Sequence, residues 1–349
     1  MRKLIGDRKF YMMLLRIAFP IMIQNGITNF VALLDNIMIG AVGTDQMSGV
    51  SIINQLIFVF NLCIFGAISG AGIFSAQFYG QGNHEGVKHS FRFKLVISTL
   101  ITVLGLVIFI LFGGRLASFY MHEGGDTGNI EATMRYSMDY LKIMLIGLFP
   151  FAVEQCYSGT LRETNETVVP MKAGIVAVCI NLVLNYILIY GKFGAPELGV
   201  EGAAIATVIA RIVECSIIII WTHTHKEKNK FIIGAYRHFT IPLSLVKNII
   251  IKGAPLLMNE CLWSAGMAML TQSYSVRGLS VVAALNISST IGNLFNIMFI
   301  AIGSAVAIIV GQYLGAGKFD DAMDTAAKII FATFIGIVII GCVLFILAP

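Results

Sequence analysis

Charged residues are scarce in this chain of 349 residues. Lys, Arg, Asp and Glu together make up 12% of the sequence, about half of the roughly 25% that is usual in soluble domains. Hydrophobic residues make up 57%, and the mean hydropathy is +0.83. These values exclude an ordinary soluble domain and predict an all-α, polytopic membrane protein. The net charge of +5 does not indicate a nucleic-acid partner, because the basic residues lie in short loops between apolar segments.

Several catalytic and cofactor motifs are also missing. The sequence has no GxxxxGK[ST] loop, which argues against an ATP-driven pump, and neither HExxH nor GxSxG. Its six cysteines are scattered without a CxxC pair, so we expect buried thiols rather than disulfides or metal ligands. The first apolar segment is too long for a cleavable signal peptide. We therefore expect no enzyme activity and no cofactor apart from a coupling ion.

Nine segments are long and apolar enough to cross a bilayer. The first six form an expected N-lobe (residues 1–225), which a cytoplasmic linker (226–243) joins to three helices of a partial C-lobe (244–349). The segments are 11–39, 48–77, 93–113, 133–155, 169–190, 200–221, 244–273, 281–312 and 326–347. Most of the 24 Lys and Arg residues fall on one side if the N-terminus is inside. This bias predicts a cytoplasmic N-terminus.

One stretch of the chain occurs twice. Residues 20–82 align without a gap on residues 255–317. The identities are mostly conformational or polar residues, and they include Pro20 with Pro255, Gln77 with Gln312, Gly80 with Gly315 and Gly82 with Gly317. Such a distant repeat predicts two similar lobes. Because the second copy contains three segments where the first lobe has six, we expect the chain to be truncated after the ninth helix.

Two prolines lie inside apolar segments, Pro20 in the first and Pro255 in the seventh. Each removes a backbone hydrogen bond and clashes with the preceding turn, so each predicts a kink. The kink is either a static feature of a packed bundle or a bend that changes during transport.

Two carboxylates lie in apolar surroundings without a basic neighbour. An ionised carboxylate in hydrocarbon costs about 2.5 kcal/mol or more. Glu260 lies near the middle of the seventh segment and Asp35 in the outer part of the first. Such a group either holds a proton or binds a cation, unless, as Asp35 could, it reaches interfacial water.

Polar residues on two further segments lie at a similar depth to Asp35. Asn181 and Asn185 are four residues apart and share one helical face. Thr207 lies on the next segment. One carboxylate, two amide oxygens and a hydroxyl suit Na⁺, or a protonated carboxyl. The same amides and hydroxyl would equally serve as hydrogen bonds between helices.

Two charged pairs occur within segments. Arg211 and Glu214 are three residues apart, as are Asp139 and Lys142. This spacing predicts an intrahelical ion pair in each case. Glu154, at the inner end of the fourth segment, receives no assignment.

Four passages resemble the multidrug and toxic compound extrusion (MATE) transporters. They are SAQFYGQGN (75–83), its echo VGQYLGAGK (310–318), SGTLRETNETVVPMKAG (158–174) and NLVLNYILIYGKFGAPELGVEGAAIATVIARIVE (181–214). The resemblance covers essentially the whole chain. The resemblance implies two six-helix lobes around a central cavity. It also implies exchange of Na⁺ or H⁺ for organic cations and amphipathic compounds by alternating access, in a bacterial inner membrane.

The resemblance also implies roles for individual residues. Asp35 matches the acid of the family's N-lobe cation site, with Asn181, Asn185 and Thr207 matching its other polar positions. These four would be the Na⁺ ligands if sodium is the coupling ion. Glu260 matches an acid of the Na⁺-coupled bacterial branch and would bind substrate or a second cation. An acid that the family carries on helix ten has no counterpart here.

The implied partners are cationic or amphipathic small molecules and the lipid bilayer, without nucleic acid, and the implied state is a monomer. Two alternatives remain open. The first is a flippase of the same superfamily for lipid-linked oligosaccharides, although acidic rather than basic cavity positions argue against it. The second is a truncated fragment that does not transport.

Overall fold

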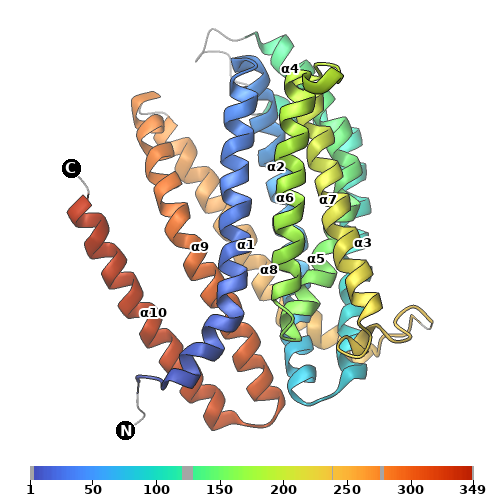
Figure 1. Cartoon of the computed structure of the whole chain (residues 1–349), viewed down its shortest axis with the longest axis vertical. Coiled ribbons are helices and arrows are strands. Elements are labelled where there is room, and N and C mark those ends of the chain that lie inside the picture. Colours follow the sequence, from blue (N-terminus) through green and yellow to red (C-terminus); the bar gives the residue numbers. More distant parts are fainter. Residues whose placement is uncertain (1–3, 120–128, 238, 276–278, 348–349) are drawn as a thin grey trace.

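The computed structural model describes residues 4–119, 129–237, 239–275 and 279–347. All regular elements in these residues are helices, which confirms the all-α prediction. The chain folds into ten α-helices and three short 3₁₀ turns within the described part (Figure 1). They are α1 (Arg8–Gly40), α2 (Thr44–Gly80), α3 (His84–Ser118), α4 (Ile130–Met144), η1 (Leu145–Gly147), α5 (Leu148–Glu163), α6 (Val168–Tyr190), η2 (Lys192–Gly194), α7 (Gly199–Thr224), η3 (Lys230–Ile232), α8 (Leu243–Ser275), α9 (Leu279–Gly315) and α10 (Phe319–Leu347).

Each predicted segment falls within this series of helices. Over the described residues, eight stretches are long and apolar enough to cross a membrane. The fourth segment is not one helix but the succession α4, η1 and α5. Pro150 explains the break, because it has no N–H to donate to the carbonyl four residues earlier, within η1.

Many apolar side chains point away from the bundle. Ile110 and Leu111 on α3 are 68% and 66% exposed. Cys156 and Cys215 are buried, but Cys179 and Cys342 are exposed, so the prediction of buried thiols was wrong for these two. An apolar segment predicts burial poorly in a membrane protein, because lipid tails are as apolar as a protein core.

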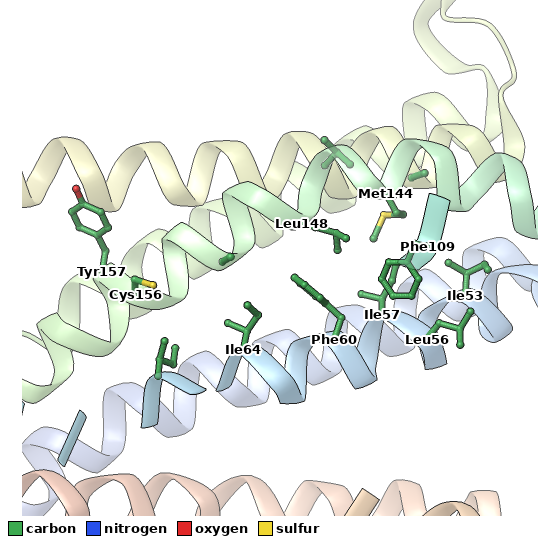
Figure 2. Packing of buried hydrophobic residues seen from close by; sticks show 14 of the residues in the cluster. Ile53, Leu56, Ile57, Phe60, Ile64, Phe109, Met144, Leu148, Cys156 and Tyr157 are labelled. Atoms are coloured by element: carbon green, nitrogen blue, oxygen red, sulfur yellow. The ribbon is translucent and has the colours of Figure 1, made fainter. Parts of the chain in front are cut away.

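The N-lobe is built around α2. Its buried face packs against α3, α4 and α5, as the side chains of Phe60, Phe109, Met144 and Leu148 show in Figure 2. Phe60 and Phe109 meet with ring centroids 6.5 Å apart. This core gives α6 and α7 a fixed support on the α4 and α5 side, since α7 packs against both helices and α6 packs against α7.

The two lobes meet where small residues allow close approach. α2 packs against α8 and α9, and α1 packs against α9. A Cβ atom on Gly70 would lie 2.7 Å from the Cα of Gly253. At the positions that the repeat relates to this pair, Ala18 of α1 and Ala305 of α9 are buried in one cluster. The interface between the lobes therefore has small residues at two equivalent helix crossings, α2 with α8 and α1 with α9.

The C-terminal ends of α2 and α9 form the tightest crossing. A Cβ atom on Gly80 would overlap the carbonyl oxygen of Gln312, and a Cβ atom on Gly315 would overlap the carbonyl oxygen of Gln77. These are the residues that the repeat aligns. We call this crossing, formed by Gln77, Gly80, Gln312 and Gly315, the inner crossing.

Both helices of the inner crossing end in the same way. Gly82 and Gly317 adopt left-handed conformations, with φ of +71° and +73°. The amide of Asn83 donates to the carbonyl of Phe78 (2.8 Å), and that of Lys318 to the carbonyl of Tyr313 (3.0 Å). Glycine is preferred here because it adopts positive φ without a steric penalty.

The linker lies against the N-lobe. Its residues Phe231 and Ile232 are 2% and 4% exposed. Arg92, on α3, donates to the carbonyl oxygens of Ala235 (2.8 Å), Gly234 (2.9 Å) and Thr240 (3.1 Å). One guanidinium therefore holds the linker backbone at three carbonyl oxygens.

Candidate ion-binding site

Asp35 is a half-buried carboxylate near the C-terminal end of α1. The Nδ2 atom of Asn185 on α6 donates to its Oδ1 at 2.6 Å. The same Nδ2 donates to the Oδ1 of Asn181 at 3.1 Å. One turn separates the two asparagines, so α6 presents both on one face toward α1 and α7.

Thr207 extends this group of residues to α7. The Nδ2 of Asn181 donates to the Oγ1 of Thr207 at 3.3 Å, and that hydroxyl donates to the carbonyl of Ala203 at 3.0 Å. The structure thus places all four predicted residues in one hydrogen-bonded chain across three helices. We call Asp35, Asn185, Asn181 and Thr207 the N-lobe polar chain.

The N-lobe polar chain contains one hydrogen-bond acceptor that has no donor among the described residues. Asn181 and Asn185 are 5% and 0% exposed. The Oδ1 of Asn185 is buried and accepts no hydrogen bond from the described residues. The amide orientation follows from chemistry, because an ionised carboxylate only accepts and so faces the NH₂ group. A buried oxygen of this kind, next to a carboxylate, is suited to ligating a cation.

Two tyrosines near the site make contacts that were not predicted. The hydroxyl of Tyr140 on α4 donates to the Oδ1 of Asn54 on α2 at 3.2 Å, and Tyr140 lies close enough to Asp35 to interact electrostatically. The hydroxyl of Tyr190 on α6 donates to the carbonyl of Met38 at 3.0 Å. Their presence as polar residues inside apolar segments was the only sequence signal available.

Glu260 lies apart from the N-lobe polar chain. It is on α8, which packs chiefly against α2 and α9, and its side chain is partly exposed. It forms no hydrogen bond or ion pair with another described residue. The structure therefore does not bring Glu260 and Asp35 into one site.

Of the two predicted ion pairs, one is present. Lys142 and Asp139 are 2.9 Å apart. Arg211 and Glu214 do not form an ion pair in the described part of the chain; instead the guanidinium of Arg211 lies over the ring of Phe151, 5.1 Å from its centroid. The prediction for this second pair was wrong, because tertiary packing directs the arginine to α5 rather than along α7.

α1 is attached to both lobes, and Pro20 lies between the attachments. Its outer part is bonded to α6 through Asp35 and Met38. Its inner part, with Leu14 and Ile17, packs with α9 and α10 in one apolar cluster. Pro20 lies inside the continuous helix, and the N-terminal part of α1 is inclined to the rest (Figure 1). Pro255 has the corresponding position inside α8.

The chain is similar to curated multidrug resistance proteins. It is 27% identical over 333 residues to the probable multidrug resistance protein NorM of Thermotoga maritima, covering 93% of this chain and 69% of that protein. It is 26% identical over 305 residues to the probable multidrug resistance protein YoeA of Bacillus subtilis, covering 86% and 64%. The chain spans about two thirds of the length of these relatives.

Solved structures share the fold. An outward-facing multidrug resistance MATE family transporter of the MOP superfamily superposes with a TM-score of 0.84 at 20% identity, over 99% of this chain and 74% of that one. A crystal structure of MATE in complex with MaD3S gives 0.83 at 21% identity, over 99% and 75%. The family model MatE matches residues 20–187 and 255–349. This match covers well over half of the sequence, and the chain therefore belongs to the MatE family of membrane transporters.

Proposed function

We propose that the protein is a secondary antiporter that exports cationic or amphipathic compounds in exchange for Na⁺ or H⁺. The observation that carries this proposal is the N-lobe polar chain, with its half-buried carboxylate, its aligned amides and the unused Oδ1 of Asn185. The curated relatives are named as multidrug resistance proteins, which supports a small-molecule substrate.

The ion would bind at Asp35, and the oxygens of Asn185, Asn181 and Thr207 are suited to complete its shell. Na⁺ would displace the NH₂ group of Asn185 from the carboxylate of Asp35, since a cation and an NH₂ group compete for the same oxygen. A proton would instead turn the carboxyl into a donor to an amide oxygen. In either case the bond between α1 and α6 changes.

α1 would carry this change to the C-lobe. Its outer part follows Asp35, its inner part is packed on α9, and Pro20 allows the two parts to change their relative angle. A new angle shifts the packing at the lobe interface and so alters which side is open. Glu260, on the other lobe, would bind the positive substrate or a second cation.

The test is dye efflux from proteoliposomes with imposed ion gradients. We expect efflux to accelerate under an inward Na⁺ gradient or an inward proton gradient, and the effective gradient identifies the ion. Asp35→Asn should abolish the acceleration. Glu85→Gln, which changes a carboxylate that is 70% exposed, is the matched control and should retain it.

Acceleration in Asp35→Asn equal to that of the unaltered protein would refute the assignment. Efflux of lipid-linked sugar without dye efflux would instead support the flippase alternative. No movement of any substrate under either gradient would support the non-transporting fragment.

A further inference from the structure

A second group of ionisable side chains lies inside the N-lobe, inward of the N-lobe polar chain. Glu154 and Arg162 come from α5, and Arg211 and Glu214 come from α7. Each of them interacts electrostatically with at least two of the others. Glu154 is only 3% exposed. We call these four residues the inner charge cluster.

The cluster is not a set of closed ion pairs. None of its four members forms an ion pair with another in the described structure. Oε2 of Glu154 accepts from Gln155 at 2.7 Å. Three buried atoms are without a hydrogen-bond partner among the described residues, namely Glu154 Oε1, Arg162 Nε and Arg211 Nη1.

These three atoms specify what the cluster binds. One is an acceptor and two are donors, so a species that satisfies them must both donate and accept, as water does. The two guanidinium groups repel a metal cation, and the two carboxylates repel an anion. The chemistry that remains is water together with an exchangeable proton on the carboxylates.

The cluster is bonded to α1. The Nη2 of Arg162 donates to the Oε1 of Gln24 at 2.9 Å. Gln24 is 9% exposed and follows Pro20 by one turn. A Cβ atom on Gly174 of α6 would lie 3.3 Å from Oε1 of Glu214 and 3.4 Å from Cγ of Gln24. Glu214 and Gln24 therefore meet over a glycine that leaves room for both.

We propose that Glu154 and Glu214 form a second, hydrated proton site that controls α1 through Arg162 and Gln24. When both carboxylates are ionised, they attract the Arg162 guanidinium and weaken its bond to Gln24. When one of them takes up a proton from the solvent, relayed by bound water, this attraction falls and Arg162 holds Gln24. The turn of α1 that follows Pro20 is thereby held or released, about 16 Å along the helix from Asp35.

Other groups around the cluster do not supply this switch. Glu163 is paired with Lys94 of α3 at 2.5 Å. α1 and α6 contribute neutral Gln24 and Gly174. The remaining titratable groups that interact with the cluster are Tyr140 of α4, Cys156 of α5 and Cys215 of α7.

Infrared spectroscopy of the purified chain in lipid tests proton binding without transport. We expect a carboxylic-acid band that titrates with pH, that is lost in Glu154→Gln or in Glu214→Gln, and that persists in Asp35→Asn. Asp139→Asn, which alters the ion pair of Asp139 with Lys142, is the matched control and should keep the band. If one glutamine variant fails to fold, the infrared band of the other variant decides the test. Retention of an unchanged band in a folded glutamine variant overturns the proposal.

A distance measurement tests the link to α1. Spin labels at Met12 and Ile220, both exposed on the inner parts of α1 and α7, should report a pH-dependent distance. Gln24→Leu should keep the infrared band but lose this pH dependence. A pH dependence that survives in Gln24→Leu overturns the link. Because neither readout requires ion-driven efflux, the proton site is tested independently of antiport.

Discussion

At the scale of single residues, Asn185 is the centre of the N-lobe polar chain, because one NH₂ group serves both Asp35 and Asn181. Asn185→Leu keeps the side-chain size but removes both hydrogen bonds. We expect a loss of stability of about 1–3 kcal/mol, since one buried and one half-buried acceptor lose their donor. Size-exclusion chromatography of heated samples gives the unfolding temperature, and its decrease reports this loss of stability.

The same variant separates an ion site from a purely structural contact. If the chain binds Na⁺, added Na⁺ should raise the unfolding temperature of the unaltered protein and leave that of Asn185→Leu unchanged. Asn29→Leu, an exposed asparagine of α1, is the control. An equal Na⁺ effect in Asn185→Leu would count against Asn185 as part of the site.

The four members of the N-lobe polar chain were predictable because each is a polar residue in an apolar helix, and helical periodicity gives their faces and depths. The bond between Arg162 and Gln24 was not, because it joins residues of different helices. Local spacing also gave the wrong partner for Arg211, which packs on Phe151. Sequence spacing describes a helix surface, whereas tertiary packing decides which neighbour a long side chain reaches.

At the scale of helices, the inner crossing depends on glycine. Gly80→Ala places a methyl group against the carbonyl of Gln312, and α2 and α9 must separate to accept it. We expect a population shift toward states in which the bundle is open at the inner crossing. Distances between spin labels at Gln81 and Lys318 should lengthen.

The repeat makes this prediction symmetric. Gly315→Ala should have the same effect as Gly80→Ala, because it overlaps the carbonyl of Gln77 in the equivalent way. Gly114→Ala is the control, since a Cβ atom there meets no neighbouring atom. Unchanged label distances in both crossing variants would show that α2 and α9 do not close this end of the bundle.

The nine segments were predictable from hydropathy, but their interruptions and contacts were not. The break at η1 arises where Pro150 and the packing of α5 meet. The repeat indicated two related lobes. The structure adds that the aligned residues meet across the interface, with Gly80 of α2 lying against α9 and Gly315 of α9 lying against α2. Internal symmetry in a sequence predicts similar parts without stating how they face one another.

At the scale of the whole molecule, the linker between the lobes is held by Arg92 through three carbonyl oxygens. Arg92→Lys keeps the charge but cannot reproduce the planar fork of donors. We expect trypsin to cleave the linker about tenfold faster, because the loss of one hydrogen bond's worth of stability favours local opening.

The control for this measurement is Lys88→Arg on the same helix, a residue that pairs with Glu85 instead of the linker, and it should leave the cleavage rate unchanged. A cleavage rate in Arg92→Lys equal to that of the unaltered protein would show that the apolar contacts of Phe231 and Ile232 hold the linker without the arginine.

Ion-coupled exchange is the central claim, and counter-transport measures it most directly. Proteoliposomes are loaded with a cationic dye, and the uptake of radioactive Na⁺ and the internal pH are followed together as the dye leaves. We expect dye efflux to drive Na⁺ or protons inward, and we expect Asp35→Asn to abolish this flux while Glu85→Gln preserves it. Dye efflux without movement of either ion, or an undiminished ion flux in Asp35→Asn, would contradict it.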